Sequence, residues 1–216
     1  MYNIFPVSIP RREEINKPLK TFASLGEYEP VSFAIRASKN LEKVKITVSK
    51  LENADGCVIP ASNVDIRQVG MIRKRSRFYR AREYMNVPLI LEKRTSYSIL
   101  KNISTCFWAT VKVPNKKLPY GNYKGIIKIS PANAPAYNLP LTLKVLPFKL
   151  KEPNNLYVAA NDIATLNHLG SKDFLNEKFR DMRAHGMTSI TWWFEDFKLK
   201  LKFNKNKVKV VFDGKS

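Results

Sequence analysis

Apolar and polar residues alternate through most of the first 150 positions, which is the period of a strand with one buried face. In VSFAIRAS, Val31, Phe33 and Ile35 fall on one face, and Ser32, Ala34 and Arg36 fall on the other. The same period recurs in LKTFASL, VKITVSKL, NVDIRQVGMI, CFWATVKV, NYKGIIKI and LPLTLKVLPF, with Pro-, Gly- or Asn-containing turns between several of them. About seven to nine such strands predict a mainly β fold for residues 1–150, an antiparallel β-sandwich of the immunoglobulin-like or jelly-roll-like kind.

The pattern changes after about residue 150. An apolar run at 156–160 predicts a strand, Ser171 and Gly186 have the residue types of a helix start and stop, and 188–194 predicts a second strand. This strand–helix–strand order is the unit of parallel α/β folds. Two strands and one helix are too few to bury their own apolar side chains. Residues 151–216 are therefore predicted to be a linker and the first part of a second domain. The alternative is a finished appendage on the sandwich edge. Residues 198–212 predict a hairpin.

The chain is strongly basic. It contains 38 Lys and Arg residues and 18 Asp and Glu residues, which give a formal net charge of +20. The lysines are spread along the chain, so most of this charge has no single site. Cys57 and Cys106 are the only cysteines, and they are expected to be free thiols rather than a disulfide or a metal site. No cofactor motif, metal site or membrane span is predicted. The sequence shows no signal peptide. A secreted or cell-surface protein from which the signal peptide had been removed would also show none.

One segment, residues 71–84, concentrates arginine among aromatic side chains. Its basic residues are Arg73, Lys74, Arg75, Arg77, Arg80 and Arg82, interleaved with Phe78, Tyr79 and Tyr84. Such a segment suits three partners: acidic residues of another domain, an acidic polysaccharide, or single-stranded nucleic acid. Docking of an inter-strand loop onto another domain is the interpretation preferred here. Polysaccharide binding is the alternative, and nucleic acid is the third.

Several stretches, in this order, resemble the N-terminal β-sandwich found in front of certain glycoside hydrolase catalytic domains. They are GEYEP at 26–30, IPASNVDIRQVG at 59–70, FWATVKVPNKKLPYGNYKGIIKI at 107–129 and LPLTLKVLPFKL at 139–150. The family is the endo-acting N-acetylgalactosaminidase-like family, with related uncharacterised glycosidases, and the resemblance covers roughly residues 19–195. It implies that a (β/α)8 barrel follows the sandwich and that residues 151–216 begin this barrel.

The resemblance also implies where substrate would bind, since (β/α)8 barrels carry their active sites at the carboxyl ends of the strands. In this chain those positions are Asn161, Asp162, Trp192, Trp193, Glu195 and Asp196, with a tryptophan able to stack on a sugar ring. The catalytic acids of the family belong to later strands, so none is assigned here. Glu27 and Glu29 are poor candidates for a catalytic pair, and Tyr123 and Trp108 are expected to point into the core.

These observations predict the non-catalytic N-terminal portion of a glycoside hydrolase, which braces the barrel and contributes to carbohydrate binding. By itself the chain is expected to be inactive. The alternative is a stand-alone module that binds acidic polysaccharide through the segment from Arg73 to Arg82.

Overall fold

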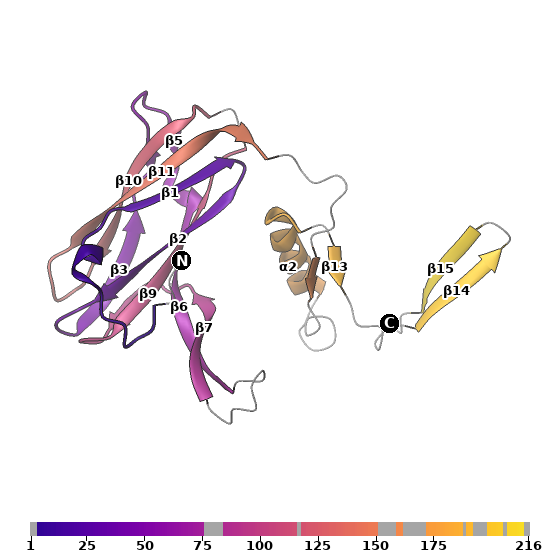
Figure 1. The fold of residues 1–216 in the computed structure, drawn as a ribbon, viewed down its shortest axis with the longest axis horizontal. Coiled ribbons are helices and arrows are strands. Elements are labelled where there is room, and N and C mark those ends of the chain that lie inside the picture. The colour runs from indigo at the N-terminus through magenta and orange to yellow at the C-terminus, as the bar shows by residue number, and fades with distance from the viewer. Residues whose placement is uncertain are drawn as a thin grey trace. The chain divides into compact units, whose positions relative to one another are not determined.

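The computed structural model describes residues 4–75, 84–115, 118–150, 159–161, 172–187, 189–191, 198–204 and 207–213. The chain divides into two compact units, Met1–Leu150 and Lys151–Ser216. Each unit has its own sheets, and the larger part of the chain is β-structure (Figure 1). The predicted mainly β fold is therefore confirmed.

Two sheets make up the first unit, besides the short 3-10 turns η1 (Arg12–Glu14) and η2 (Ala61–Asn63). The larger sheet has the order β1 (Leu19–Leu25), β11 (Tyr137–Lys149), β10 (Gly121–Ser130), β3 (Leu41–Val48), β8 (Tyr97–Ile99). The short strands β4 (Leu51–Glu52) and β5 (Val58–Ile59) join it beside β10. The smaller sheet has the order β2 (Tyr28–Arg36), β9 (Ser104–Lys112), β6 (Val64–Arg75), β7 (Tyr84–Glu92).

The strand pairing differs from the prediction in two respects. β1 runs parallel to β11, with Leu19 opposite Leu141, so the first unit is not wholly antiparallel. Its described part has eleven strands, more than the predicted number. β4, β5 and β8 are too short to show a period, and β7 contains Pro88 within consecutive apolar residues. Proline without an N–H is tolerated there because β7 is an edge strand.

One hydrophobic core takes side chains from both sheets. At its centre Phe107 is fully buried; its ring stacks on Phe33 at 5.4 Å between centroids and meets Tyr97 edge-on at 5.0 Å. Tyr123 is also fully buried and donates a hydrogen bond to the Pro119 carbonyl at 2.7 Å, so its prediction as a core residue is confirmed. The prediction for Trp108 is wrong. Phe107 faces the core, and alternation places its neighbour Trp108 on the opposite face of β9, where it is half-buried.

The two carboxylates of GEYEP, those of Glu27 and Glu29, stabilise the turn between β1 and β2 through hydrogen bonds. The Glu27 carboxylate accepts hydrogen bonds from the Ser24 backbone N–H at 2.8 Å and from the Ser24 hydroxyl at 3.0 Å. The Glu29 carboxylate accepts one from the Thr21 hydroxyl at 2.9 Å. Gly26, in the turn between the two strands, has φ +82°, a conformation that favours glycine. These contacts give both glutamates a structural role.

We expect Glu27→Ala to lower the free energy of unfolding by about 1–3 kcal/mol, because Ser24 is fully buried and would lose the acceptor for two donors. Urea denaturation followed by circular dichroism measures the change. Glu42→Ala is the matched control, since Glu42 is an exposed strand residue whose carboxylate accepts no hydrogen bond from the described residues. Equal stability of the two variants would contradict the role given to Glu27.

The second unit contains the predicted strand–helix–strand order. Its elements are β12 (Ala159–Asn161), α2 (Lys172–Ala184), β13 (Ser189–Thr191), β14 (Lys198–Asn204) and β15 (Lys207–Asp213). β12 and β13 pair in parallel, and β14 and β15 form the predicted antiparallel hairpin. Gly186 ends the helix with φ +87°, as its position predicted, while Ser171 lies outside the described residues. One parallel pair does not show a barrel, which stays a prediction.

Among the helices that the structure describes, none is long and apolar enough to cross a membrane.

Candidate functional site

The described residues of the basic segment lie in strands, at the end of β6 and the start of β7, and the residues predicted to form the inter-strand loop lie outside the described part of the chain. Arg73, Lys74 and Arg75 are the last residues of β6, and Tyr84 is the first residue of β7. Arg77, Arg80 and Arg82 lie outside the described residues.

β6 and β7 extend beyond the smaller sheet as a two-stranded ribbon. β6 pairs with β9 only as far as Gln68 opposite Phe107, but it pairs with β7 as far as Arg75 opposite Tyr84. We call residues 69–75 and 84–91 the β6–β7 ribbon, which projects from the first unit in Figure 1. A two-stranded ribbon is only marginally stable alone in water, so packing against a partner would stabilise the β6–β7 ribbon.

The β6–β7 ribbon exposes apolar and basic side chains together. Arg73 lies over the ring of Tyr84 at 5.3 Å, and no acidic side chain among the described residues pairs with Lys74 or Arg75. The large exposed apolar side chains of β7 are Tyr84 (59% exposed), Met85 (53%), Leu89 (59%), Ile90 (43%) and Leu91 (42%). Clustered exposed apolar residues commonly mark interaction sites. The β6–β7 ribbon is therefore a candidate docking surface of the first unit.

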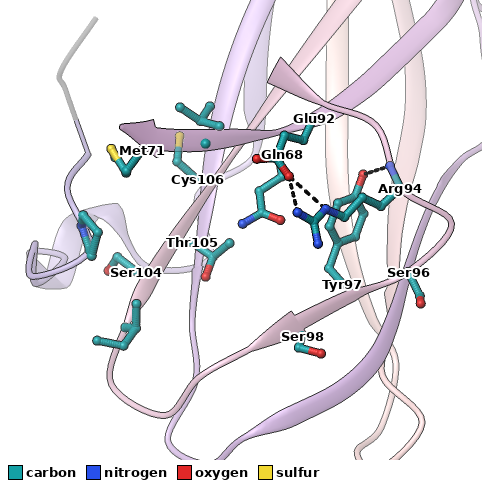
Figure 2. A pocket seen from close by; sticks show the side chains of 14 residues that line it. Gln68, Met71, Glu92, Arg94, Ser96, Tyr97, Ser98, Ser104, Thr105 and Cys106 are labelled. Atoms are coloured by element: carbon teal, nitrogen blue, oxygen red, sulfur yellow. Dashed lines mark hydrogen bonds and ion pairs between the residues drawn. The ribbon is translucent and has the colours of Figure 1, made fainter. Parts of the chain in front are cut away.

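A cavity of about 380 Å³ lies where β6 separates from β9. From Cys106 back to Ser104, β9 continues beside β2, and Ser104 lies opposite Arg36. The N-terminal arm takes the place of β6 there, since the Pro6 carbonyl accepts the Ser104 N–H at 2.9 Å. We call this opening the fork. Its lining includes Gln68, Glu92, Arg94, Tyr97, Thr105 and Cys106 (Figure 2).

An ion pair forms the polar wall of the fork. Arg94 donates hydrogen bonds from its Nε (2.9 Å) and Nη2 to Glu92 Oε2. The backbone N–H of Arg94 is 3.4 Å from the Tyr97 hydroxyl, which accepts it (Figure 2). Gly70 makes room for the carboxylate, because a Cβ there would lie 2.8 Å from Glu92 Oε1.

The fork holds no activated nucleophile among its described residues. Burial raises the pKa of the Cys106 thiol to about 11, so the reactive thiolate is scarce near neutral pH. Cys57 and Cys106 are both free thiols, as predicted. The chemistry of this wall is hydrogen bonding rather than covalent catalysis.

A second charge cluster lies on the outer face of the smaller sheet. Asp65 accepts from Arg67 Nε at 2.5 Å and from Lys93 Nζ at 2.6 Å. Partial burial opposes ionisation of Asp65, but the hydrogen bonds from Lys93 and Arg67 outweigh it and hold the carboxyl pKa below its ordinary value.

We expect Asp65→Asn to lower the free energy of unfolding at pH 7 by a few tenths to about 1 kcal/mol, because the cluster is partly exposed. A depressed folded-state pKa stabilises the protein above the unfolded-state pKa, and this stabilisation is lost as the pH falls through the folded-state value. Urea denaturation at pH 7 and at about pH 2.5 should show the difference from wild type shrinking on acidification. A difference that persists unchanged at low pH would show that charge is not its cause.

The predicted barrel positions are mostly outside the described residues. Asn161 is the last residue of β12 and lies opposite Thr191, the last residue of β13, so the carboxyl ends of these strands are adjacent. The remaining candidates lie outside the described residues: Asp162, Trp192, Trp193, Glu195 and Asp196. Their part in substrate binding stays a prediction.

Sequence reasoning missed the residues of the fork. Gly70 within the alternating run NVDIRQVGMI was the available signal, since a glycine inside a strand marks a bulge or a close approach. The structure has both: pairing shifts register after Gly70, and Glu92 lies over it.

No protein family and no curated protein sequence matches the chain. Among solved structures, the chain is similar to a family 123 glycoside hydrolase from Clostridium perfringens, whose structural analysis concerns glycolipid glycan hydrolysis. The TM-score is 0.68 at 18% identity, over 91% of this chain and 39% of that one. This likeness shows a shared fold, and it is consistent with the relation to glycoside hydrolases that the sequence motifs suggested.

Weaker similarities include the periplasmic chaperone SfaE and a Bacteroides ovatus family 5 xyloglucanase solved with a heptasaccharide. The chaperone has a TM-score of 0.35 at 13% identity, over 63% of this chain and 58% of that one. The xyloglucanase has 0.32 at 8%, over 73% and 22%. The chain spans about two fifths of the length of the family 123 hydrolase, whose fold it shares.

Proposed function

We propose that this chain is the non-catalytic N-terminal portion of a glycoside hydrolase. Residues 1–150 are an accessory β-sandwich that braces a (β/α)8 barrel, and residues 151–216 are the linker and first strand–helix–strand portion of this barrel. The observation that carries the proposal is the fold similarity to a family 123 hydrolase, which extends over 91% of this chain but only 39% of that one.

Two features of the fold support the proposal. Two sheets that share one core are the architecture of a sandwich, immunoglobulin-like or jelly-roll-like in class. A parallel pair, β12 and β13, joined through a helix is the repeating unit of a (β/α)8 barrel. Asn161 at the end of β12, with Asp162, Trp192, Trp193, Glu195 and Asp196, then belongs to the substrate face of the barrel.

The β6–β7 ribbon is the part of the sandwich that we assign to docking on the barrel domain. It combines exposed apolar side chains with Arg73, Lys74 and Arg75, and these three basic side chains have no acidic partner among the described residues. An acidic surface with apolar patches on the catalytic domain would complement it. Arg77, Arg80 and Arg82 are assigned to the same contact from their place in the sequence.

The activity test compares the 216-residue chain with the complete product of its gene on a panel of aryl glycosides. We expect hydrolysis by the complete product and none by the chain alone. Hydrolysis by the purified chain, abolished by a substitution within it, would overturn the assignment of catalysis to a later part of the protein.

A second candidate function is a stand-alone module that binds acidic polysaccharide through the same ribbon. The cation–π pair of Arg73 and Tyr84 favours it, beside Lys74 and Arg75, which have no acidic partner among the described residues. Retention on heparin tests it. A triple change of Arg73, Lys74 and Arg75 to glutamate is compared with the same change of Lys124, Lys128 and Lys144, exposed lysines of the larger sheet.

Both triple variants alter the net charge equally. Loss of retention only in the ribbon variant would favour the polysaccharide module, and equal loss in both would show unspecific attraction to polyanions. Steep loss of binding to any DNA with added salt would favour nucleic acid instead.

A further inference from the structure

The fork has the size and construction of a small-molecule site. Its volume of about 380 Å³ lies at the lower end of the range for ligand pockets. Three separate features form it: the end of pairing between β6 and β9, the N-terminal arm at Pro6, and the segment from Glu92 to Ser98 after β7.

The two oxygens of the Glu92 carboxylate differ in their partners among the described residues. Its Oε2 accepts both hydrogen bonds from Arg94, whereas no described residue donates one to Oε1. Oε1 lies over Gly70, where any larger residue would collide with it. This arrangement places a carboxylate oxygen beside a guanidinium group, so that an acceptor and a donor stand next to each other.

The lining selects for a neutral, hydroxyl-rich ligand. Glu92 and Arg94 cancel in charge, and the other polar side chains are neutral, among them Gln68, Ser98 and Thr105. A carboxylate oxygen and a guanidinium N–H can together bind two neighbouring hydroxyl groups, one as donor and one as acceptor. Apolar contacts from Met71, Ile103 and Pro6 would suit the C–H face of such a ligand.

We propose that the fork binds one neutral sugar residue, held through a pair of adjacent hydroxyl groups by Glu92 Oε1 and Arg94. This site lies on the first unit and is distinct from the predicted barrel positions and from the basic residues of the β6–β7 ribbon. It goes beyond the proposed function, because a sugar could bind here whether or not the chain belongs to a hydrolase.

Two other ligand classes fit the fork less well. An added peptide strand would need the free edge of β9, but the Pro6 carbonyl already accepts the Ser104 N–H and the Ser8 carbonyl accepts the Ser104 hydroxyl at 2.7 Å. An anion would have to compete with Glu92 for Arg94. A neutral polyhydroxyl ligand uses the ion pair as it stands.

The test is ¹H–¹⁵N NMR titration of the 216-residue chain with methyl glucoside, methyl galactoside and N-acetylglucosamine, each added singly. We expect saturable shifts at Gly70, Arg94 and Thr105 with one of them, and a dissociation constant on the order of 1 mM, as suits a ligand of this size. Glu92→Ala should weaken binding at least about tenfold by removing a charged hydrogen-bond acceptor.

Glu52→Ala is the matched control. Glu52 is also a strand glutamate paired with a basic residue two positions away, Lys50 at 2.7 Å, but it is not part of the fork lining. Gly70→Ala is a second variant, which keeps Glu92 but displaces its carboxylate, and it should also weaken binding. Absence of saturable shifts with all three sugars, or equal binding by wild type, Glu92→Ala and Gly70→Ala, would overturn the proposal.

Discussion

Replacing Phe107 with alanine is expected to lower the free energy of unfolding of the first unit by about 3–5 kcal/mol. Phe107 is fully buried on β9, stacks on Phe33 and meets Tyr97 edge-on. Alanine would remove both ring contacts and leave a cavity between the two sheets, since a close-packed interior collapses only partly around a lost side chain. Much of the stability of an ordinary domain would be lost.

Phe22→Ala is the matched control, because Phe22 lies on β1 with 61% of its surface exposed. Its replacement should change the free energy of unfolding by no more than about 0.5 kcal/mol. Urea denaturation of the chain, followed by circular dichroism, measures both. If Phe107→Ala were no more destabilising than Phe22→Ala, the two sheets would not share the core described here.

Gly125→Val is also expected to lower the free energy of unfolding, by about 1–3 kcal/mol. A Cβ on Gly125 would lie 3.0 Å from the Lys50 carbonyl oxygen, 3.1 Å from Ser49 Oγ and 3.2 Å from Leu51 Cγ. Ser49 cannot easily move away, since its hydroxyl donates to the Lys50 carbonyl at 2.8 Å and accepts the Ile126 N–H at 2.9 Å. Valine would therefore disturb the passage from β3 to β4 beside β10.

Lys124→Val provides the comparison for Gly125→Val, since Lys124 is the preceding residue of β10 and is exposed. Valine suits a strand, so this variant should keep nearly wild-type stability. Thermal unfolding of the two variants measures the difference. Equal midpoints would mean that β10 and the segment from Ser49 to Leu51 do not approach as closely as described.

Alternation along the chain predicted most of the long strands because it reports a local property, the burial of one face. It could not report pairing. The parallel contact of β1 with β11 joins residues far apart in sequence, and the length of β6 beyond β9 depends on register. The face of a strand that points into the core also depends on the opposite sheet. Phe107 and Trp108 are both large aromatic residues of β9, and only the core shared by the two sheets decides that Phe107 points inward.

The two candidate sites also differ in how far the sequence alone predicts them. Arg73, Lys74 and Arg75 were recognisable from composition, because a cluster of arginine and lysine stands out in any sequence. The fork was not, because Gln68, Glu92 and Thr105 are ordinary polar residues from three strands or their ends. They come together only where pairing between β6 and β9 stops, which no local pattern encodes.

The coding sequence of the gene beyond the codon for Ser216 tests whether residues 151–216 begin a (β/α)8 barrel. We expect an open frame that continues with alternating strands and helices, and with Asp or Glu at the carboxyl ends of later strands, as the active site of a (β/α)8 glycoside hydrolase requires. A stop codon directly after Ser216 would contradict it, and would leave residues 151–216 as a finished appendage of a sugar- or polyanion-binding module.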